Sequence, residues 1–340
     1  MLPIVIVNWN GHEDTIECLE SLLRLDHEDA RIIVCDNGSD QGSVKAILDW
    51  AHGAREARRT GPIWARLPLE RRREPSIAVI GMNEIDRAPA GDPFITVITI
   101  GTNLGFAGGN NVGIRHAQAR CSFRLLWLLN NDTVVAPGAA AAFLARYYEG
   151  GGEGHRALGL CAGELRFYDT PDAIQALGGG FNPQTLVTRH LSAHTAVSNV
   201  PDRTVIEEAL AYPIGANMVV SSAFLEAVGL MEEGYFLFYE ELDWALRGRD
   251  QFQIGFAPGA VVYHKEGGTI GTSTRGHQSA MSTYFLRRGL LLFTAKFFPR
   301  KRKQAIALII WYALGDLAQL RFDRVSAAFR AIKAASARGA

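Results

Sequence analysis

Three groups of polar residues follow apolar stretches of this chain and have the side chains for chemistry. The first, Asn130-Asn131-Asp132-Thr133, comes directly after five apolar residues, 125–129. One Asp beside two amides and a hydroxyl suits a hard divalent cation that is held against phosphate oxygens. The alternative is a strand-to-helix turn, in which Asn and Asp tolerate the turn dihedrals and Asp132 or Thr133 caps the next helix.

A second group has the side chains to bind a nucleotide. Asp36 follows the apolar residues 32–35, and a carboxylate there can accept the ring N–H of uracil, thymine or guanine, which adenine and cytosine lack. Further along, the glycine-rich residues 101–111 open an expected helix, where close backbone approach and helix-start amides favour a diphosphate. Each pattern also occurs in ordinary turns, and the glycines do not fit the GxGxxG dinucleotide fingerprint.

A third group contains acids that could act as a base. Glu240 and Glu241 directly follow residues 235–239, four of which are aromatic. Carboxylates at the edge of an apolar surface have a raised pKa and can take a proton from a hydroxyl. The alternative is that acids at a helix start complement the helix dipole, and that Asp243 pairs with Arg247 four residues later.

One histidine completes the set of candidates. His264 ends the apolar run 260–263, and a sheet would carry it to the side on which Asp132 lies. There it could complete a metal site, whereas the alternative is a histidine with only a structural role.

The elements that must position these residues follow from short apolar stretches bounded by polar breaks. Such stretches, too short for isolated helices, predict strands that are buried on both faces of a parallel sheet. They alternate with stretches of helical periodicity, which predicts an α/β fold whose ligands bind at the carboxyl ends of the strands. The predicted strands include 3–7, 32–35, 94–100, 125–129 and 260–263, and the predicted helices include 13–24 and 137–148.

Composition bounds the remaining possibilities. Lys plus Arg equals Asp plus Glu at 35 each in 340 residues, which gives no support to a general nucleic-acid binder. Residues 53–93 are rich in arginine and break the strand–helix alternation, so we expect a surface insertion with a solvated face, or alternatively a site for an anionic acceptor or lipid headgroup. The four cysteines lack CxxC spacing and no signal peptide is evident, which indicates reduced core residues of a cytosolic protein.

Seven short motifs occur in one order along the chain. They are VNWNG at 7–11, DNGS at 36–39, NLGFAGGNN at 103–111, LLNNDT at 128–133, GANM at 215–218, YEELDWALR at 239–247 and YH at 263–264. Together they resemble family 2 glycosyltransferases, which are nucleotide-sugar enzymes of the GT-A fold, and most of all the bacterial rhamnosyltransferase-like members. The resemblance implies a mostly parallel central sheet flanked by helices. The implied domains are a GT-A catalytic domain at 1–270, with a nucleotide-binding half at 1–133 and an acceptor half at 134–270, and a C-terminal helical region at 278–337.

The resemblance also implies roles for individual residues. Asp132 would bind Mg²⁺ or Mn²⁺ together with His264 and the donor diphosphate, although Asn130 stands where many relatives carry the first acid of Asp-x-Asp. Glu241 would be the general base, with Glu240 or Asp243 as substitutes, because Glu240-Glu241 replaces the Glu-Asp pair of the family. The donor-binding candidates are Asn8 and Asp36 at the base and ribose, Asn103, Gly105 and Asn111 at the diphosphate, and Asn10, Asn37 and Asn131 in the same motifs.

The implied reaction is a single inverting displacement in polysaccharide or cell-envelope synthesis. It would move rhamnose or a similar hexose from a UDP- or dTDP-sugar to a hydroxyl of a glycan or lipid-linked acceptor. The missing acid at position 130 and the Glu-Glu pair leave a non-catalytic nucleotide-sugar-binding or scaffold protein as an alternative. A sugar nucleotidyltransferase shares the sheet architecture, but it would carry a GxGTRL-like loop near the N-terminus, which VNWNG is not.

The C-terminal stretch 304–320 is unusually apolar and too short to span a membrane. It could be a helix packed on the catalytic domain or on a second subunit, as in a homodimer. It could equally be an interfacial helix that the basic residues 300–303 dock on anionic lipid. The expected location is the cytoplasm, with a possible peripheral contact through 298–320 at the inner face of the cytoplasmic membrane.

Overall fold

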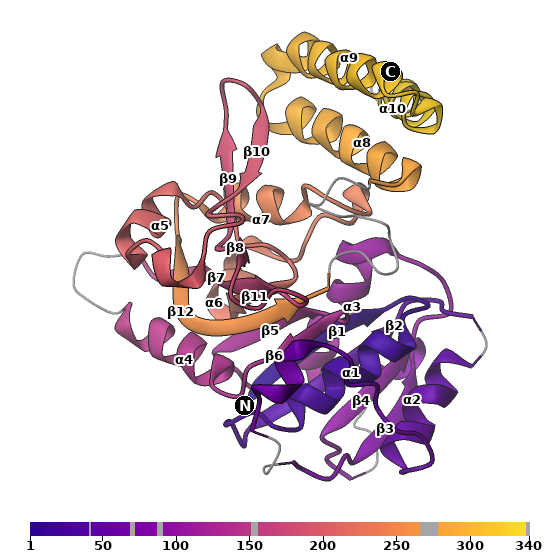
Figure 1. The fold of residues 1–340 in the computed structure, drawn as a ribbon, viewed down its shortest axis with the longest axis vertical. Coiled ribbons are helices and arrows are strands. Elements are labelled where there is room, and N and C mark those ends of the chain that lie inside the picture. Colours follow the sequence, from indigo (N-terminus) through magenta and orange to yellow (C-terminus); the bar gives the residue numbers. More distant parts are fainter. Residues whose placement is uncertain (41, 69–71, 87–90, 151–155, 266–277, 338–340) are drawn as a thin grey trace.

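The chain folds into a mixed α/β body with a layer of helices at one end (Figure 1). This computed structural model describes residues 1–340 except 41, 69–71, 87–90, 151–155, 266–277 and 338–340. Within the described residues, ten strands form one sheet in the order β3-β4-β2-β1-β5-β11-β7-β12-β6, with β8 beside β7.

The N-terminal half of the sheet is parallel, as the short apolar stretches predict. In the register of these strands Asn8 lies opposite Asp36, and Val7 lies opposite Asn130. The polar residues that follow three separate strands are therefore brought to one edge. The parallel strands are β1 (Leu2–Asn8), β2 (Ala30–Asp36), β3 (Ile77–Gly81), β4 (Ile95–Thr99) and β5 (Leu125–Asn130).

Helices cover both faces of this half. Ile4 and Ile6 pack on the side of α1 (His12–Leu22) and α2 (Ser43–Ala51), whereas Val5 faces α3 (Gly105–Arg120). Side chains alternate between the two faces of a strand, so covering both faces requires apolar residues at every position. This explains why the strands are uninterrupted apolar runs in the sequence.

The second half of the sheet has mixed strand directions. Strand β11 runs antiparallel to both β5 and β7, whereas β12 runs parallel to β7. The stretches 254–257 and 260–263 belong to one strand, β12, which is interrupted by a register shift between Phe256 and Val261. The elements of this half are β6 (Thr133–Val135), α4 (Ala139–Glu149), β7 (Leu158–Phe167), β8 (Ile174–Ala176), α5 (Arg203–Ala209), β11 (Asn217–Ser221), α6 (Ser222–Val228), α7 (Glu240–Gly248) and β12 (Gln253–His264).

Residues 53–93 are more than a surface insertion. They supply β3, which pairs with β4 at the sheet edge, and the short 3-10 helices Pro62–Ala65 and Met82–Glu84. Ile63 and Trp64 are buried in a small cluster with residues from the far half of the sheet. Sequence periodicity missed this packing because only two consecutive apolar residues carry it.

Four of the six described arginines of this segment form ion pairs within the chain. Arg55 and Arg58 contact Glu13, Arg66 pairs with Asp172 at 2.7 Å, and Arg72 pairs with Glu20 at 3.1 Å. The charge of these four is thus largely matched by carboxylates of the protein itself, which leaves less for an external anion; Arg71 and Arg87 lie outside the described residues.

The C-terminal region consists of α8 (Ala280–Phe297), α9 (Arg302–Ala318) and α10 (Phe322–Ala337). A hairpin of β9 (Gly179–Asn182) and β10 (Val187–His190) reaches from the body to these helices (Figure 1). Phe181 of the hairpin packs edge-on against Phe293, and Lys301 donates to the Pro183 carbonyl oxygen at 2.7 Å. The remaining 3-10 helices are Val197–Asn199, Glu233–Tyr235 and Pro299–Lys301.

Cys18, Cys35 and Cys161 are buried and Cys121 is half-buried, all as free thiols, and burial raises the pKa of Cys18 and Cys35 to about 12. Among the described helices, none combines the length and the apolar character that crossing a membrane requires.

Candidate active site

A cavity of about 1000 Å³ lies at the carboxyl ends of the parallel strands and extends toward the C-terminal helices. It brings together residues from motifs that are far apart in the chain. The predicted site residues that line it are Asn37, Asn103, Gly105, Asn131, Asp132, Glu240, Glu241 and His264. Asn8, Asn10, Asp36, Asn111 and Asp243 are not among its lining residues.

Asn8 and Asp36 lie behind the cavity wall. The Asn8 amide donates to Asp36 Oδ2 at 2.7 Å and to Ser43 Oγ at 2.9 Å, while Asn8 Oδ1 accepts from Thr15 Oγ1 at 2.9 Å. Asp36 also accepts from the Ser39 backbone N–H at 3.2 Å. The pair therefore fixes the loops after β1 and β2. Trp9, the next residue after Asn8, is the one that reaches the cavity.

The glycine-rich loop is built around two asparagines. Asn37 Nδ2 donates to Asn103 Oδ1 at 3.0 Å and to the Gly105 carbonyl oxygen at 3.1 Å, and Asn103 Oδ1 also accepts from the Gly105 N–H at 2.8 Å. Gly105 has φ +74°, and a Cβ there would lie 2.2 Å from the Phe236 carbonyl oxygen. That carbonyl accepts from the Phe106 N–H at 2.7 Å, so the loop is joined to the segment that precedes Glu240.

Two donor-binding candidates have other partners. Asn111 Nδ2 donates to the Met231 carbonyl oxygen and to Glu233 Oε1, both at 2.9 Å, so it ties α3 to a neighbouring loop. Asn10 is exposed, and its Oδ1 accepts from the Asp40 N–H at 2.7 Å. Asn111 is not among the residues that line the cavity, and its contact with the diphosphate stays a prediction.

Asp132 and His264 meet at the cavity floor. His264 Nε2 lies 3.1 Å from Asp132 Oδ1, and His264 Nδ1 lies 3.0 Å from Gln175 Oε1. Two ligand atoms that are each about 2.1 Å from one metal ion, and at right angles to each other, lie about 3 Å apart. The distance between His264 Nε2 and Asp132 Oδ1 fits this arrangement. Gln175 Oε1 would accept the Nδ1 proton, so that Nε2 would be the atom that coordinates a cation, which is the usual outer support of a metal-bound histidine.

The donor set is small. The described residues contain no group of three or more His, Cys, Asp or Glu side chains that could hold a metal ion. Asp132 and His264 therefore fit a cation that takes its remaining oxygens from a ligand or from water, and they do not fit an ion caged by protein alone.

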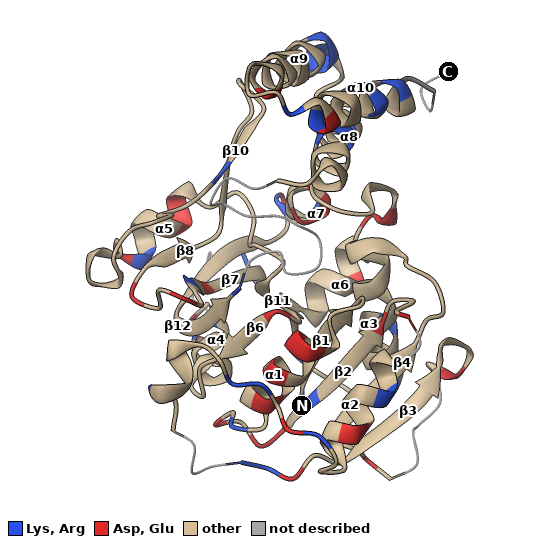
Figure 2. Cartoon of the chain, turned by 45° about the vertical axis from the view of Figure 1, so that its right-hand side comes forward, with Lys and Arg blue, Asp and Glu red and all other residues tan. Residues whose placement is uncertain are grey.

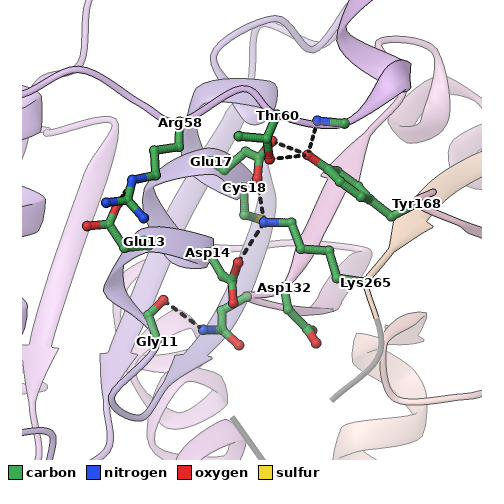
Figure 3. Close-up of polar contacts among 12 residues, drawn as sticks. Gly11, Glu13, Asp14, Glu17, Cys18, Arg58, Thr60, Asp132, Tyr168 and Lys265 are labelled. Carbon is green, nitrogen blue, oxygen red and sulfur yellow. Dashed lines mark hydrogen bonds and ion pairs between the residues drawn. The ribbon is translucent and has the colours of Figure 1, made fainter. Parts of the chain in front are cut away.

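A buried ion network supports this floor from behind (Figure 3). Lys265, the residue after His264, binds Asp14 at 2.6 Å and also contacts Glu17, both on α1. Glu17 accepts from Tyr168 Oη and Trp64 Nε1, each at 2.5 Å. The Lys265 N–H donates to the Asp132 carbonyl oxygen at 3.0 Å, so the network fixes the backbone of both cavity residues.

Glu240 and Glu241 start α7 after a strained loop. Phe236, Phe238 and Tyr239 all have positive φ, an arrangement that concentrates at functional sites. Glu240 is buried, and within the described structure its Oε2 has no hydrogen-bond partner. Burial, and then the charge of Glu241, holds the pKa of Glu240 well above its ordinary value.

Glu241 is the more accessible of the two acids. It is half-buried, and its Oε1 accepts from the Gly215 N–H at 3.2 Å. Burial raises the pKa of Glu241, while backbone hydrogen bonds, including the one from Gly215, oppose the rise. Adjacent carboxyls with raised pKa values can hold one proton between them and accept another from a substrate.

Asp243 forms the ion pair with Arg247 that sequence analysis gave as the alternative to a catalytic role. It is fully buried, and it binds Arg247 Nε at 2.7 Å, Lys296 Nζ at 2.6 Å and Tyr235 Oη at 3.0 Å. These contacts join α7 to α8 and leave Asp243 away from the cavity, so it is a poor substitute for the base.

Several lining residues were not predicted from sequence. Except for Trp9 after β1 and Gln175 in β8, they come from the β9–β10 hairpin, the loop before β11 and the C-terminal helical region, which sequence analysis could not place against the sheet. Only Trp9 had a signal, as an aromatic residue between two asparagines after a buried strand. The unpredicted residues include Trp9, Gln175, Arg189, Tyr212, Phe285, Leu286, Arg321 and Arg324.

Comparison with known proteins agrees with the fold. Residues 4–69 match the model of the family described as glycosyl transferase family 2. No curated protein sequence matches the chain. The mannosyltransferase PcManGT from Pyrobaculum calidifontis, in complex with GDP-Man and Mn2+, aligns with 100% of this chain and 76% of its own at 14% identity, with a TM-score of 0.51. TarS 1-349 from S. aureus aligns with 86% of this chain and 65% of its own at 12% identity, with a TM-score of 0.46.

The likeness to the mannosyltransferase establishes the architecture alone, because the identity is low. The chain has a GT-A fold with a large, mostly parallel central sheet flanked by helices, and it carries C-terminal helices, as the sequence predicted. The family match covers the segment that contains VNWNG and DNGS.

Proposed function

We propose that this protein is an inverting glycosyltransferase that moves a sugar from a nucleotide donor to an acceptor hydroxyl. The main support is that three groups of residues line one cavity. The Asn37–Asn103 loop would bind a nucleoside diphosphate, Asp132 and His264 would bind a cation, and Glu240 and Glu241 are the two candidate bases. The GT-A fold and the family match at residues 4–69 support the proposal.

The donor we propose is a UDP- or dTDP-sugar, with rhamnose or a similar hexose as the sugar. Trp9 and Asn37 would contact the nucleoside, and the backbone around Asn103 and Gly105 would lie beside the diphosphate. Asn8 and Asp36 are better suited to holding these loops than to direct contact, since their polar atoms already bind each other and neighbouring residues.

A divalent cation, Mg²⁺ or Mn²⁺, is the proposed cofactor. Asp132 and His264 would hold it, and when bound it would stabilise the negative charge of the leaving diphosphate. The mannosyltransferase of similar fold was solved with Mn2+, which supports this proposal. The rest of the catalysis depends on side chains of the chain itself.

The reaction we propose is one displacement at the anomeric carbon. The acceptor oxygen forms a bond to that carbon while the bond to the diphosphate oxygen breaks, and the hydroxyl proton passes to Glu241 or Glu240. A raised carboxyl pKa suits a base that must take a proton from a neutral hydroxyl. The nucleoside diphosphate leaves with the bonding electrons, so no covalent enzyme intermediate is needed.

A scaffold protein that binds nucleotide sugars without turnover is the second candidate. The small metal donor set, with Asn130 in place of an acid, favours it. Donor hydrolysis in the presence of Mn²⁺ or Mg²⁺ separates the two. We expect slow hydrolysis by the wild type and a loss of at least about 100-fold in Glu241→Gln, the range of general-base effects.

Binding must be measured beside turnover. The melting temperature should rise with UDP or dTDP in both the wild type and Glu241→Gln, because ligands that bind the folded state stabilise it. If both bind the donor and neither turns it over with any acceptor, the transferase proposal fails and the scaffold remains.

We also propose a peripheral contact with anionic lipid at the inner face of the cytoplasmic membrane. In α9, Ile310, Trp311 and Leu314 are exposed by 39%, 71% and 55%, and they share one helical face. Residues 304–315 carry no charged side chain, whereas 300–303 are all basic (Figure 2). An apolar face beside a basic cluster complements a membrane with negative headgroups.

A further inference from the structure

The cavity has a second part beyond the two glutamates, walled by aromatic and aliphatic side chains. Phe236, Phe285 and Leu286 line it, and the rings of Phe236 and Phe285 stack with centroids 4.6 Å apart. We call these three residues the apolar wall. The whole cavity, at about 1000 Å³, is at the upper end for a site that holds one small ligand, so it has room for a donor and part of an acceptor.

Positive charge gathers at the helical end of this part. Arg321 and Arg324 line the cavity, and both approach the same oxygen of Asp316, at 3.9 and 3.5 Å. Arg287 lies over the Tyr312 ring at 4.2 Å and within electrostatic reach of Asp316 and Arg324. We call Arg321 and Arg324 the arginine subsite; Arg287 lies near them but is not among the residues that line the cavity.

The subsite has more positive charge than its neighbours balance. Arg321 and Arg324 share one carboxylate, that of Asp316, and both ion pairs to it are longer than a close salt bridge. Arg287 Nε is buried and, within the described residues, lacks a hydrogen-bond partner. Burial lowers the pKa of Arg287, which is the direction for a cation removed from water without a matching anion. An anion bound by Arg321 and Arg324 would add the negative charge that this group of arginines lacks.

The chemistry of the subsite selects a phosphate. Planar guanidinium forks bind the oxygens of phosphate in pairs, and several can share one phosphate from different sides. The adjoining apolar wall would suit a hydrocarbon chain, and the two glutamates that border this part of the cavity suit a hydroxyl. A ligand with all three features is an amphiphile that carries a phosphate.

We propose that the arginine subsite binds the phosphate of an amphiphilic acceptor whose hydrocarbon portion lies along the apolar wall. The identification of this ligand as the acceptor rests on the proposed glycosyl transfer. The binding itself does not, and it can be measured without donor, metal or turnover.

The test is calorimetric titration of the purified full chain with decyl phosphate, inorganic phosphate and octyl glucoside. We expect decyl phosphate to bind at least about tenfold more tightly than inorganic phosphate, because burying even a few methylene groups gives that factor. Octyl glucoside, which has a chain and no charge, should bind more weakly than decyl phosphate.

Two substitutions should change this affinity in opposite directions. Arg321→Gln with Arg324→Gln should weaken decyl phosphate binding at least tenfold, and Asp316→Asn should strengthen it, because it removes the competing carboxylate. Arg330→Gln, on an exposed part of α10, is the matched control and should leave the affinity unchanged. If the ion pairs with Asp316 serve only to hold the helices together, the double arginine variant and Asp316→Asn would both lower the melting temperature. Both would then change the affinity for decyl phosphate in the same direction.

Other outcomes are equally decisive. Equal affinity for decyl and inorganic phosphate would replace the amphiphile with a free phosphate and overturn the proposal, as would equal binding of octyl glucoside. A UDP-induced rise in melting temperature that persists in the Arg321/Arg324 variant would show that such a failure leaves the proposed transferase intact.

Discussion

At the scale of single residues, Glu240 is the side chain with the clearest pH dependence. Its pKa is raised above the ordinary value of 4.5 by burial, so the folded protein binds this proton more tightly than the unfolded chain. The native state is therefore favoured at low pH and loses this advantage as pH rises through the folded pKa. Glu240→Gln keeps a neutral side chain at every pH.

We expect the melting temperature of the wild type to fall more steeply above pH 4.5 than that of Glu240→Gln, measured by calorimetry in a series of buffers from pH 4.5 upward. Glu226→Gln, on the exposed side of α6, controls for the loss of any carboxyl and should follow the wild type. Parallel curves for the wild type and Glu240→Gln would contradict the raised pKa.

Lys265 gives a second prediction at this scale, concerning stability. Replacement by Met would remove the only ammonium group shown beside Glu17 in Figure 3 and leave that carboxylate buried with its two neutral donors. We expect a loss of about 2 kcal/mol in the free energy of unfolding, in the range for a hydrogen bond to a charged group.

Chemical denaturation measures this loss. Lys45→Met is the matched control, because Lys45 pairs with Asp49 on the exposed surface of α2, and it should change stability by less than about 0.5 kcal/mol. Equal effects of the two substitutions would mean that the Lys265 network contributes no more than a surface pair.

The comparison of sequence with structure is most informative for residues that have two possible roles. The pattern of Asp243 and Arg247 fitted a helix ion pair, and Asp243 was also a possible substitute for the general base; the structure has the ion pair. Asn111 looked like a phosphate neighbour because it ends a glycine-rich motif, yet helix rotation directs it to Met231. Spacing identifies such candidates, but the direction of a side chain depends on packing that the sequence does not display.

At the scale of elements, the close contact of the glycine-rich loop with the segment before Glu240 predicts the effect of a substitution at Gly105. Gly105→Ala would place a Cβ 2.2 Å from the Phe236 carbonyl oxygen, and φ +74° is itself unfavourable for alanine. We expect destabilisation of about 1–3 kcal/mol or more and a weaker affinity for the nucleotide, because the loop must move away from the segment before Glu240.

The control for this change is Gly101→Ala. Gly101 has a similar φ of +83°, but no atom lies within 4 Å of the place that its Cβ would take, so it isolates the backbone strain from the steric contact. Equal stability losses and unchanged UDP affinity in both variants would mean that the approach to Phe236 has no role in binding.

Elements differed in how well the sequence predicted them. The strands β1, β2 and β5 were evident because burial on both faces leaves an uninterrupted apolar run. The β9–β10 hairpin was not evident, because much of its stabilisation comes from distant partners such as Phe293, and local alternation is weak. Strand β3 was hidden for a similar reason, since it is a half-exposed edge strand.

At the scale of the whole molecule, α9 presents its apolar face away from the catalytic body, and the membrane contact is the last prediction. Trp311→Glu should reduce co-sedimentation with vesicles that contain anionic lipid by at least about tenfold, because it removes apolar burial and adds a repelled charge. Wild-type binding should weaken as the salt concentration rises, because salt screens the positive charges of residues 300–303.

The control is Val205→Glu, which changes an exposed apolar residue on α5 and should bind like the wild type. Vesicle binding that is unaffected by Trp311→Glu, or a wild-type dimer that this change converts to a monomer, would assign the face to a second copy instead.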